Sequence, residues 1–169
     1  QDVRRLAPLV DGFLVGSSVM AEQDLHNAVK KLIYGKTKIC GITQVADAQV
    51  VKNSGAIYAG LIFAKKSPRC VTFDTALSIV DAVPFNYVGV FVNADTMQVV
   101  HYANELNLHA VQLHGSENQQ YISSLREQLP EQCQIWKALG VEDKLPNMDY
   151  SDLDYLLLDC KIGEQSGGT

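Results

Sequence analysis

The sequence predicts an α/β fold in which parallel strands alternate with helices, and three observations support this prediction. Short runs rich in β-branched and aromatic residues recur at intervals of 20 to 29 residues. These runs are continuous rather than alternating, which is typical of strands covered on both faces of a parallel sheet. Several segments between them carry apolar residues at helical spacing. Right-handed βαβ units are the expected result.

The predicted strands are seven short apolar runs. In chain order they are GFLVG (12–16), TKICGI (37–42), AIYAGLIF (56–63), YVGVFV (87–92), AVQL (110–113), IWKAL (135–139) and YLLLD (155–159).

Three helices are predicted between these strands. An apolar stripe over residues 25–33 stops at Gly35, in the position of a helix C-terminal cap. A second stripe covers residues 76–83 and ends before a proline, which cannot continue a helix. A third helix follows Ser116, which forms a predicted capping box with Gln119.

Two architectures fit this alternation: an open doubly wound sheet and a (β/α)8 TIM barrel. The glycine signature GxGxxG that follows the first strand of dinucleotide-binding folds is missing, which favours the barrel. A complete barrel has eight strands and typically ~250 residues. With 169 residues and seven predicted strands, the chain is expected to contain an incomplete barrel.

Composition excludes several classes of function. The net charge of −5 argues against a nucleic-acid partner, whose phosphates require a basic surface. No apolar run is long enough to cross a membrane, and the N-terminal residues do not resemble a signal peptide. The four cysteines are widely spaced, which predicts neither a metal site nor a disulfide framework and favours the reducing cytoplasm. Because the chain begins with glutamine, we expect it to be a piece of a longer protein.

Polar residues at the carboxyl ends of the predicted strands are the candidates for chemistry, because these ends form the catalytic mouth of a barrel. They are Ser17, Cys40, Arg69, Asn93, Gln112, His114, Lys137 and Asp159.

Each candidate also has a purely structural interpretation. Cys40 could be a small core residue, since free cysteines are often buried. His114, beside a glycine, could stabilise a turn. Lys137 could extend out of the barrel toward solvent. Asp159 could accept hydrogen bonds in a loop. Their shared position at one end of the sheet carries more weight than any single residue.

Two glycine-containing segments are candidate phosphate sites. The loop after Asp159 contains Gly167 and Gly168, whose backbone amides could bind an oxyanion. The segment with Gly16 and Ser17 precedes a predicted helix, and helix N-termini attract anions.

Five motifs in order give the sequence a family resemblance: KICGIT, GLIFAKKSPRCV, VGVFVN, VQLHG and LLLDCKIGEQSGGT. Together they resemble phosphoribosylanthranilate isomerase, a (β/α)8 enzyme of tryptophan biosynthesis. The resemblance implies an Amadori rearrangement of N-(5-phosphoribosyl)anthranilate, a small phosphorylated substrate, without a cofactor or a metal. By match to the family motifs, Cys40 is the general base and Asp159 the general acid. Arg69 matches the arginine that binds the anthranilate carboxylate.

The resemblance also implies roles for the residues around this pair. Gln112 and His114 are expected to bind the substrate. The base needs thiolate character, which requires positive potential near its sulfur. Lys38 lies two positions before Cys40, on the same face of the strand.

The resemblance divides the chain in two. Residues 36–169 correspond to strands one to six of the isomerase barrel. Residues 1–35 resemble the last strand and helix of indole-3-glycerol-phosphate synthase, which precedes the isomerase in the bifunctional enzyme of enteric-type bacteria. Residues 13–15 are therefore expected to be able to pair beside residues 38–42 as a surrogate strand.

The last two βα units, which bind the substrate phosphate in the family, are expected to be missing. Two alternatives to an active isomerase therefore remain: a non-catalytic fragment of the bifunctional enzyme, and a flavodoxin-like binding domain.

Overall fold

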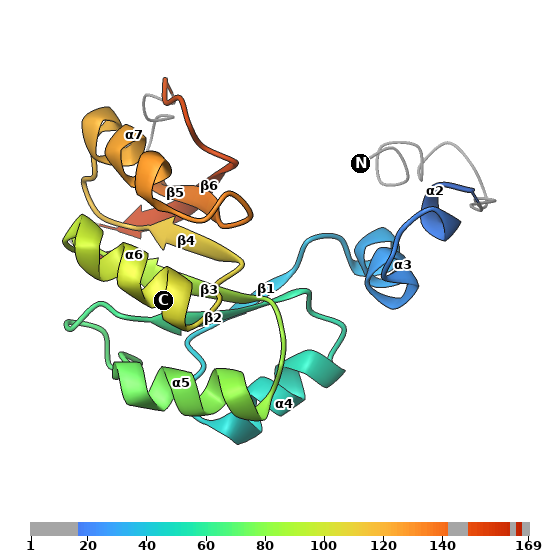
Figure 1. Cartoon of the computed structure of the whole chain (residues 1–169). Helices are drawn as coiled ribbons and strands as arrows, with labels where there is room; N and C mark the ends of the chain where they lie inside the picture. Colours follow the sequence, from blue (N-terminus) through green and yellow to red (C-terminus); the bar gives the residue numbers. More distant parts are fainter. Residues whose placement is uncertain (1–16, 142–148, 163–164, 167–169) are drawn as a thin grey trace.

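The computed structural model describes residues 17–141, 149–162 and 165–166. Its centre is a curled sheet in which six strands pair in chain order, all parallel (Figure 1). A two-residue strand, β7, pairs antiparallel with the end of β6. The strands are β1 (Lys38–Cys40), β2 (Tyr58–Ile62), β3 (Tyr87–Phe91), β4 (Ala110–Leu113), β5 (Gln134–Val141), β6 (Tyr155–Ile162) and β7 (Gln165–Ser166). Six of the seven predicted strands are therefore confirmed, and the one at residues 12–16 lies outside the described residues.

Four helices cover the outer side of this sheet (Figure 1). They are α4 (Val45–Asn53), α5 (Phe73–Ala82), α6 (Thr96–Glu105) and α7 (Gln119–Gln128). The stripes over 76–83 and after Ser116 correspond to α5 and α7, whereas α4 and α6 were not singled out from the sequence. Two further helices, α2 (Ser17–Met20) and α3 (Leu25–Tyr34), stand apart from the sheet.

The predicted capping box at the start of α7 is wrong. The N-cap is Asn118, whose side chain accepts a hydrogen bond from the backbone N–H of Tyr121 at 2.9 Å. Ser116 lies two residues before this N-cap, and its backbone N–H and hydroxyl both donate to the side-chain oxygen of Asn93. Gln119 is also engaged elsewhere, with Ser151.

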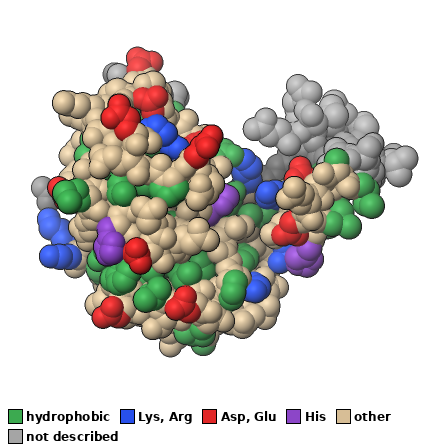
Figure 2. Space-filling model, in the orientation of Figure 1, with side chains coloured by type: hydrophobic (Ala, Val, Ile, Leu, Met, Phe, Trp, Pro, Cys, Tyr) green, Lys and Arg blue, Asp and Glu red, His purple; other side chains and the backbone are tan. Residues whose placement is uncertain are grey.

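The apolar stripe of α3 forms the predicted helix, and its C-cap is Gly35 at φ +72°. The stripe is nevertheless exposed: Leu25 and Ile33 are 44% and 63% accessible. Figure 2 shows apolar side chains at the surface of this part of the chain (right). Helical spacing therefore predicted the helix correctly, but none of the described residues buries its apolar face.

Side-chain alternation along the strands creates two cores. A large one lies between the sheet and α4–α7. A smaller one fills the inner side of the sheet, with Tyr58 from β2, Val88 from β3 and Trp136 from β5. The Trp136 ring packs edge-on against Tyr58 and against Tyr155, with ring centroids 5.0 and 5.6 Å apart. Lys36, just before β1, lies 4.2 Å above the Tyr155 ring. These aromatic contacts fill the interior near the amino ends of the strands and leave space near the carboxyl ends.

Burial in these cores predicts a loss of stability at alkaline pH. Desolvation raises the pKa of Cys133 from 9.0 to about 11 and those of Tyr87 and Tyr121 from 10.0 to about 12. Each group binds its proton more tightly in the folded state than in the unfolded state. Its contribution to the free energy of unfolding is therefore fully present below about pH 9 and is lost as the pH rises through 11 to 12. Urea unfolding across this range should show a falling midpoint. A midpoint that stays constant up to pH 12 would contradict the burial of these groups.

Candidate active site

A cavity of about 600 Å³ opens at the carboxyl ends of the parallel strands. It gathers five of the eight strand-end candidates: Cys40, Arg69, Gln112, His114 and Asp159. The other lining residues are Lys38, Ile62, Ala64, Lys66, Ser67, Val90, Val92, Ala138, Leu157 and Leu158. Cys40 and Asp159, which lie far apart in the sequence, thus line one cavity at the mouth of the curled sheet.

β1 places Cys40 and Lys38 on the inner face of the sheet. The Lys38 ammonium lies 3.4 Å from the Cys40 sulfur. In the parallel register Cys40 stands opposite Gly60 of β2. A Cβ atom on Gly60 would lie 2.6 Å from the sulfur and 3.1 Å from the Cys40 Cα. The missing side chain at Gly60 therefore provides the space that the thiol occupies.

This close approach makes Gly60→Ala a test of the Cys40 position. The added methyl group overlaps the sulfur and the Cys40 backbone, and overpacking of this kind typically costs about 1–3 kcal/mol. We expect the free energy of unfolding in urea to fall by that amount. An unchanged value would mean that Cys40 does not lie against Gly60.

Arg69 reaches the cavity from the loop after β2. Its guanidinium Nη1 donates to the backbone carbonyl of Cys40 at 3.2 Å. The side chain passes over Gly41, which has φ +91° and where a Cβ would meet Arg69 at 2.7 Å. Glycine at this position therefore allows both the left-handed backbone and the close passage of the arginine. The other two guanidinium nitrogens, Nη2 and Nε, can donate hydrogen bonds to a carboxylate at the cavity mouth.

Four side chains form a continuous polar chain across the inner face of the sheet. The Lys38 ammonium donates to Gln112 Oε1 at 2.5 Å. Gln112 Nε2 lies 3.3 Å from His114 Nδ1. His114 Nε2 lies 3.1 Å from Asp159 Oδ2. His114 is therefore a cavity residue rather than only a turn residue.

Asn93 and Lys137 belong to a different network, at the ends of β3, β4 and β5. Lys137 is 1% exposed and pairs with Glu117 at 3.1 Å. The Lys137 ammonium also donates to the backbone carbonyl of Gly115 at 2.7 Å. The expectation that Lys137 extends toward solvent is therefore wrong: its side chain lies on the face of β5 opposite Trp136 and Ala138 and ends at a buried carboxylate.

Glu117 organises this network, and it is not among the residues predicted from the sequence. Its two carboxylate oxygens accept hydrogen bonds from the backbone N–H groups of Asn93 and Gly115, at 2.8 and 2.9 Å. It thus joins the ends of β3, β4 and β5, directly beside His114. The only signal in the sequence was an acidic residue two positions after Gly115.

The proposed phosphate-binding residues contribute no described side chain to this cavity. Gly16, Gly167 and Gly168 lie outside the described residues, as do residues 13–15, so the surrogate strand stays a prediction. Ser17 begins α2.

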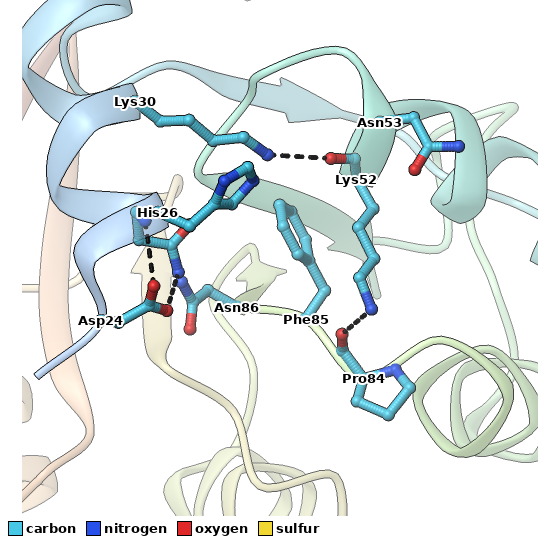
Figure 3. A pocket seen from close by; sticks show the side chains of 9 residues that line it. Asp24, His26, Lys30, Lys52, Asn53, Pro84, Phe85 and Asn86 are labelled. Carbon is cyan, nitrogen blue, oxygen red and sulfur yellow. Dashed lines mark hydrogen bonds between the residues drawn. The ribbon is translucent and has the colours of Figure 1, made fainter.

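A second cavity, of about 780 Å³, lies at the opposite end of the sheet, between α3, the end of α4 and the loop before β3 (Figure 3). Its two lysines donate to backbone carbonyls: Lys30 to that of Lys52, and Lys52 to that of Pro84. It is larger than the first cavity, but it contains none of the strand-end candidates. The smaller cavity is therefore the candidate active site, because it contains the candidate catalytic residues.

Two further observations concern ligands and membranes. Within the described ranges, no cluster of three or more His, Cys, Asp or Glu side chains could hold a metal ion. In the same part of the chain, no helix has the length and apolar character needed to cross a membrane.

Comparison with known proteins gives consistent matches. The family model described as N-(5'phosphoribosyl)anthranilate (PRA) isomerase matches residues 37–169. Proteins named "Tryptophan biosynthesis protein TrpCF" are 48% identical in Vibrio cholerae, over the whole chain, and 48% identical in Salmonella typhi, over 93% of it. The chain spans only 36% and 35% of the length of these two relatives.

Solved structures match the same architecture. Phosphoribosyl anthranilate isomerase from Thermotoga maritima superposes with a TM-score of 0.68 at 33% identity, covering 79% of this chain and 65% of that one. The enzyme from Thermus thermophilus gives 0.67 at 32% identity, covering 76% and 64%. The six parallel strands and their helices are therefore an incomplete barrel of this type.

Proposed function

Because the chain belongs to the N-(5'-phosphoribosyl)anthranilate isomerase family, we propose that it carries the isomerase site of a tryptophan-biosynthesis enzyme. The reaction is the Amadori rearrangement of N-(5-phosphoribosyl)anthranilate to 1-(2-carboxyphenylamino)-1-deoxyribulose 5-phosphate. It is an aldose–ketose isomerisation, that is, an intramolecular oxidoreduction, and it needs only acid–base groups. The observation that carries the proposal is that Cys40 and Asp159 line one cavity at the carboxyl ends of the strands.

The residue roles are those implied by the resemblance to the family motifs, applied here to the order of proton transfers. Asp159, as general acid, gives a proton to the ribose ring oxygen, and the bond from that oxygen to C1′ breaks to leave an iminium ion. Cys40, as thiolate base, removes the proton from C2′ to form an enolamine. The enolamine then gains a proton at C1′ while its 2′-hydroxyl loses one, which yields the ketone. Acid and base thus act on different atoms of one substrate, so they must share a cavity.

The surroundings of the cavity support an anionic substrate. Lys38, Lys66 and Arg69 line it, against a single lining carboxylate, Asp159. A guanidinium suits the anthranilate carboxylate because its fork matches the two oxygens. A structure described as phosphoribosyl anthranilate isomerase in complex with reduced 1-(o-carboxyphenylamino)-1-deoxyribulose 5-phosphate also superposes on this chain, with a TM-score of 0.59 at 36% identity.

We further propose that residues 1–35 are the end of a preceding synthase-like barrel. The family model begins at residue 37, whereas the Vibrio cholerae relative matches all 169 residues. Homology that continues upstream of the isomerase model supports a junction between two units. We place the reaction in the cytoplasm, as expected of a chain whose described cysteines, Cys40, Cys70 and Cys133, are free thiols.

A steady-state isomerase assay on the 169-residue chain tests the proposed function. Asp159→Asn keeps the size of the side chain but removes its acid proton, so measurable turnover should be lost in this variant. No turnover in the unsubstituted chain would instead favour the non-catalytic fragment. That alternative is supported by the exposure of Leu158 on β6 (55%) and Ile39 on β1 (42%), which no described residue covers.

A further inference from the structure

The geometry of the polar chain assigns roles beyond those of the acid and the base. We propose that Lys38 and Gln112 are positioning residues: the Lys38 ammonium maintains Cys40 as a thiolate, and Gln112 fixes the proton of His114 on the nitrogen that faces Asp159. The catalytic importance of these two roles rests on the proposed isomerase function. The expectation that Gln112 also contacts the substrate stays a prediction.

Lys38 is suited to this role by its position. The charged and titratable groups that share the cavity with Cys40 are Lys38, Lys66, Arg69, His114 and Asp159. Arg69 directs its described hydrogen bond to the Cys40 backbone carbonyl. The Lys38 ammonium lies 3.4 Å from the sulfur itself, and a nearby cation favours the thiolate over the thiol. Its bond to Gln112 Oε1 holds the flexible side chain in this place.

The identity of each donor determines the proton on His114. An ammonium can only donate, so the Gln112 oxygen must face Lys38 and the Gln112 amide nitrogen must face His114. That nitrogen can only donate, so His114 Nδ1 must be the acceptor. The imidazole proton is then on Nε2, where it donates to Asp159 Oδ2 at 3.1 Å. One oxygen of Asp159, Oδ2, thereby accepts the Nε2 proton of His114.

The test measures alkylation of each cysteine by iodoacetamide in the folded 169-residue chain, with peptides resolved by mass spectrometry. At neutral pH, Lys38→Met should slow modification of Cys40 roughly tenfold, since the thiolate is the reactive species. Lys65→Met removes the same charge from an exposed loop position and should leave the rate unchanged. Lys38→Arg, which keeps the cation, should recover part of the rate. Cys70 serves as an internal reference in every sample.

The pH dependence of alkylation separates the effect of the Lys38 charge from a change in the accessibility of Cys40 to iodoacetamide. At about pH 10 an ordinary thiol is ionised, so the Lys38→Met variant and the unsubstituted chain should react at similar rates. Equal rates at neutral pH, or an equal slowing at both pH values, would overturn the role of Lys38. Because Cys40 alkylation does not require turnover, this outcome is independent of whether the isomerase assay succeeds.

The His114 tautomer gives a second readout for Gln112. Imidazole ¹⁵N chemical shifts in the unsubstituted chain should show a neutral ring protonated at Nε2. Gln112→Leu removes the donor to Nδ1 and should produce a mixture of tautomers. A ring protonated at Nδ1 in the unsubstituted chain, or a tautomer unaffected by Gln112→Leu, would overturn the role of Gln112.

Discussion

Cys40→Ser is expected to lower isomerase turnover by roughly 10²–10⁴-fold, the usual contribution of a positioned general base. Serine has nearly the shape of cysteine, so the packing against Gly60 is preserved. Its hydroxyl, however, does not ionise near neutral pH and cannot take the C2′ proton as the thiolate does. The measurement is kcat in the steady-state assay, with folding checked by circular dichroism.

Cys70→Ser is the matched control for this prediction. Cys70 is also a free, half-buried thiol, but it does not line the cavity. Its substitution should leave kcat within a factor of two or so, as is usual for residues outside a site. If Cys40→Ser retained full turnover, Cys40 would be a packing residue and the base would have to lie elsewhere.

The second large effect is on stability. Lys137→Met should lower the free energy of unfolding by about 3–5 kcal/mol, because it leaves the Glu117 carboxylate buried without its cation. The side chains of Lys137 and Glu117 are 2% and 1% exposed, so water cannot compensate. Urea unfolding can be followed by the fluorescence of Trp136, the single tryptophan of the chain, which is itself buried.

Two further variants make this result specific to the ion pair. Lys65→Met, at an exposed position, should change the free energy of unfolding by less than about 0.5 kcal/mol. Lys137→Met combined with Glu117→Gln removes both charges and should cost less than the sum of the single variants. A loss below about 1 kcal/mol for Lys137→Met would mean that the pair is solvated.

Strand positions could be predicted from the sequence because parallel strands covered on both faces leave continuous apolar runs. The same reasoning placed Cys40 and Asp159 at strand ends, and the fold brings both to one cavity. It also noted Lys38 on the face of Cys40, since side chains two apart on a strand point the same way. The contact between them depends on the rotamer of a long flexible side chain, which spacing does not determine.

The errors have a common physical origin. Ser116 matches a capping box locally, but a partner more than twenty residues earlier, Asn93, takes its hydrogen-bonding groups. Lys137 looks like a strand-end residue that extends to water, but Glu117 folds back from the loop after β4 to meet it. Both depend on contacts between distant segments, which local patterns do not contain.

The account rests on Cys40 and Asp159 acting on one substrate from one cavity. A crystal structure of the chain with reduced 1-(o-carboxyphenylamino)-1-deoxyribulose 5-phosphate tests this most directly. We predict the ligand at the carboxyl ends of the strands, with the Cys40 sulfur against C2′, the Asp159 carboxyl group at the former ring oxygen and Arg69 on the aromatic carboxylate. A ligand bound beside α3, or one that only one of the two residues can reach, would contradict the account.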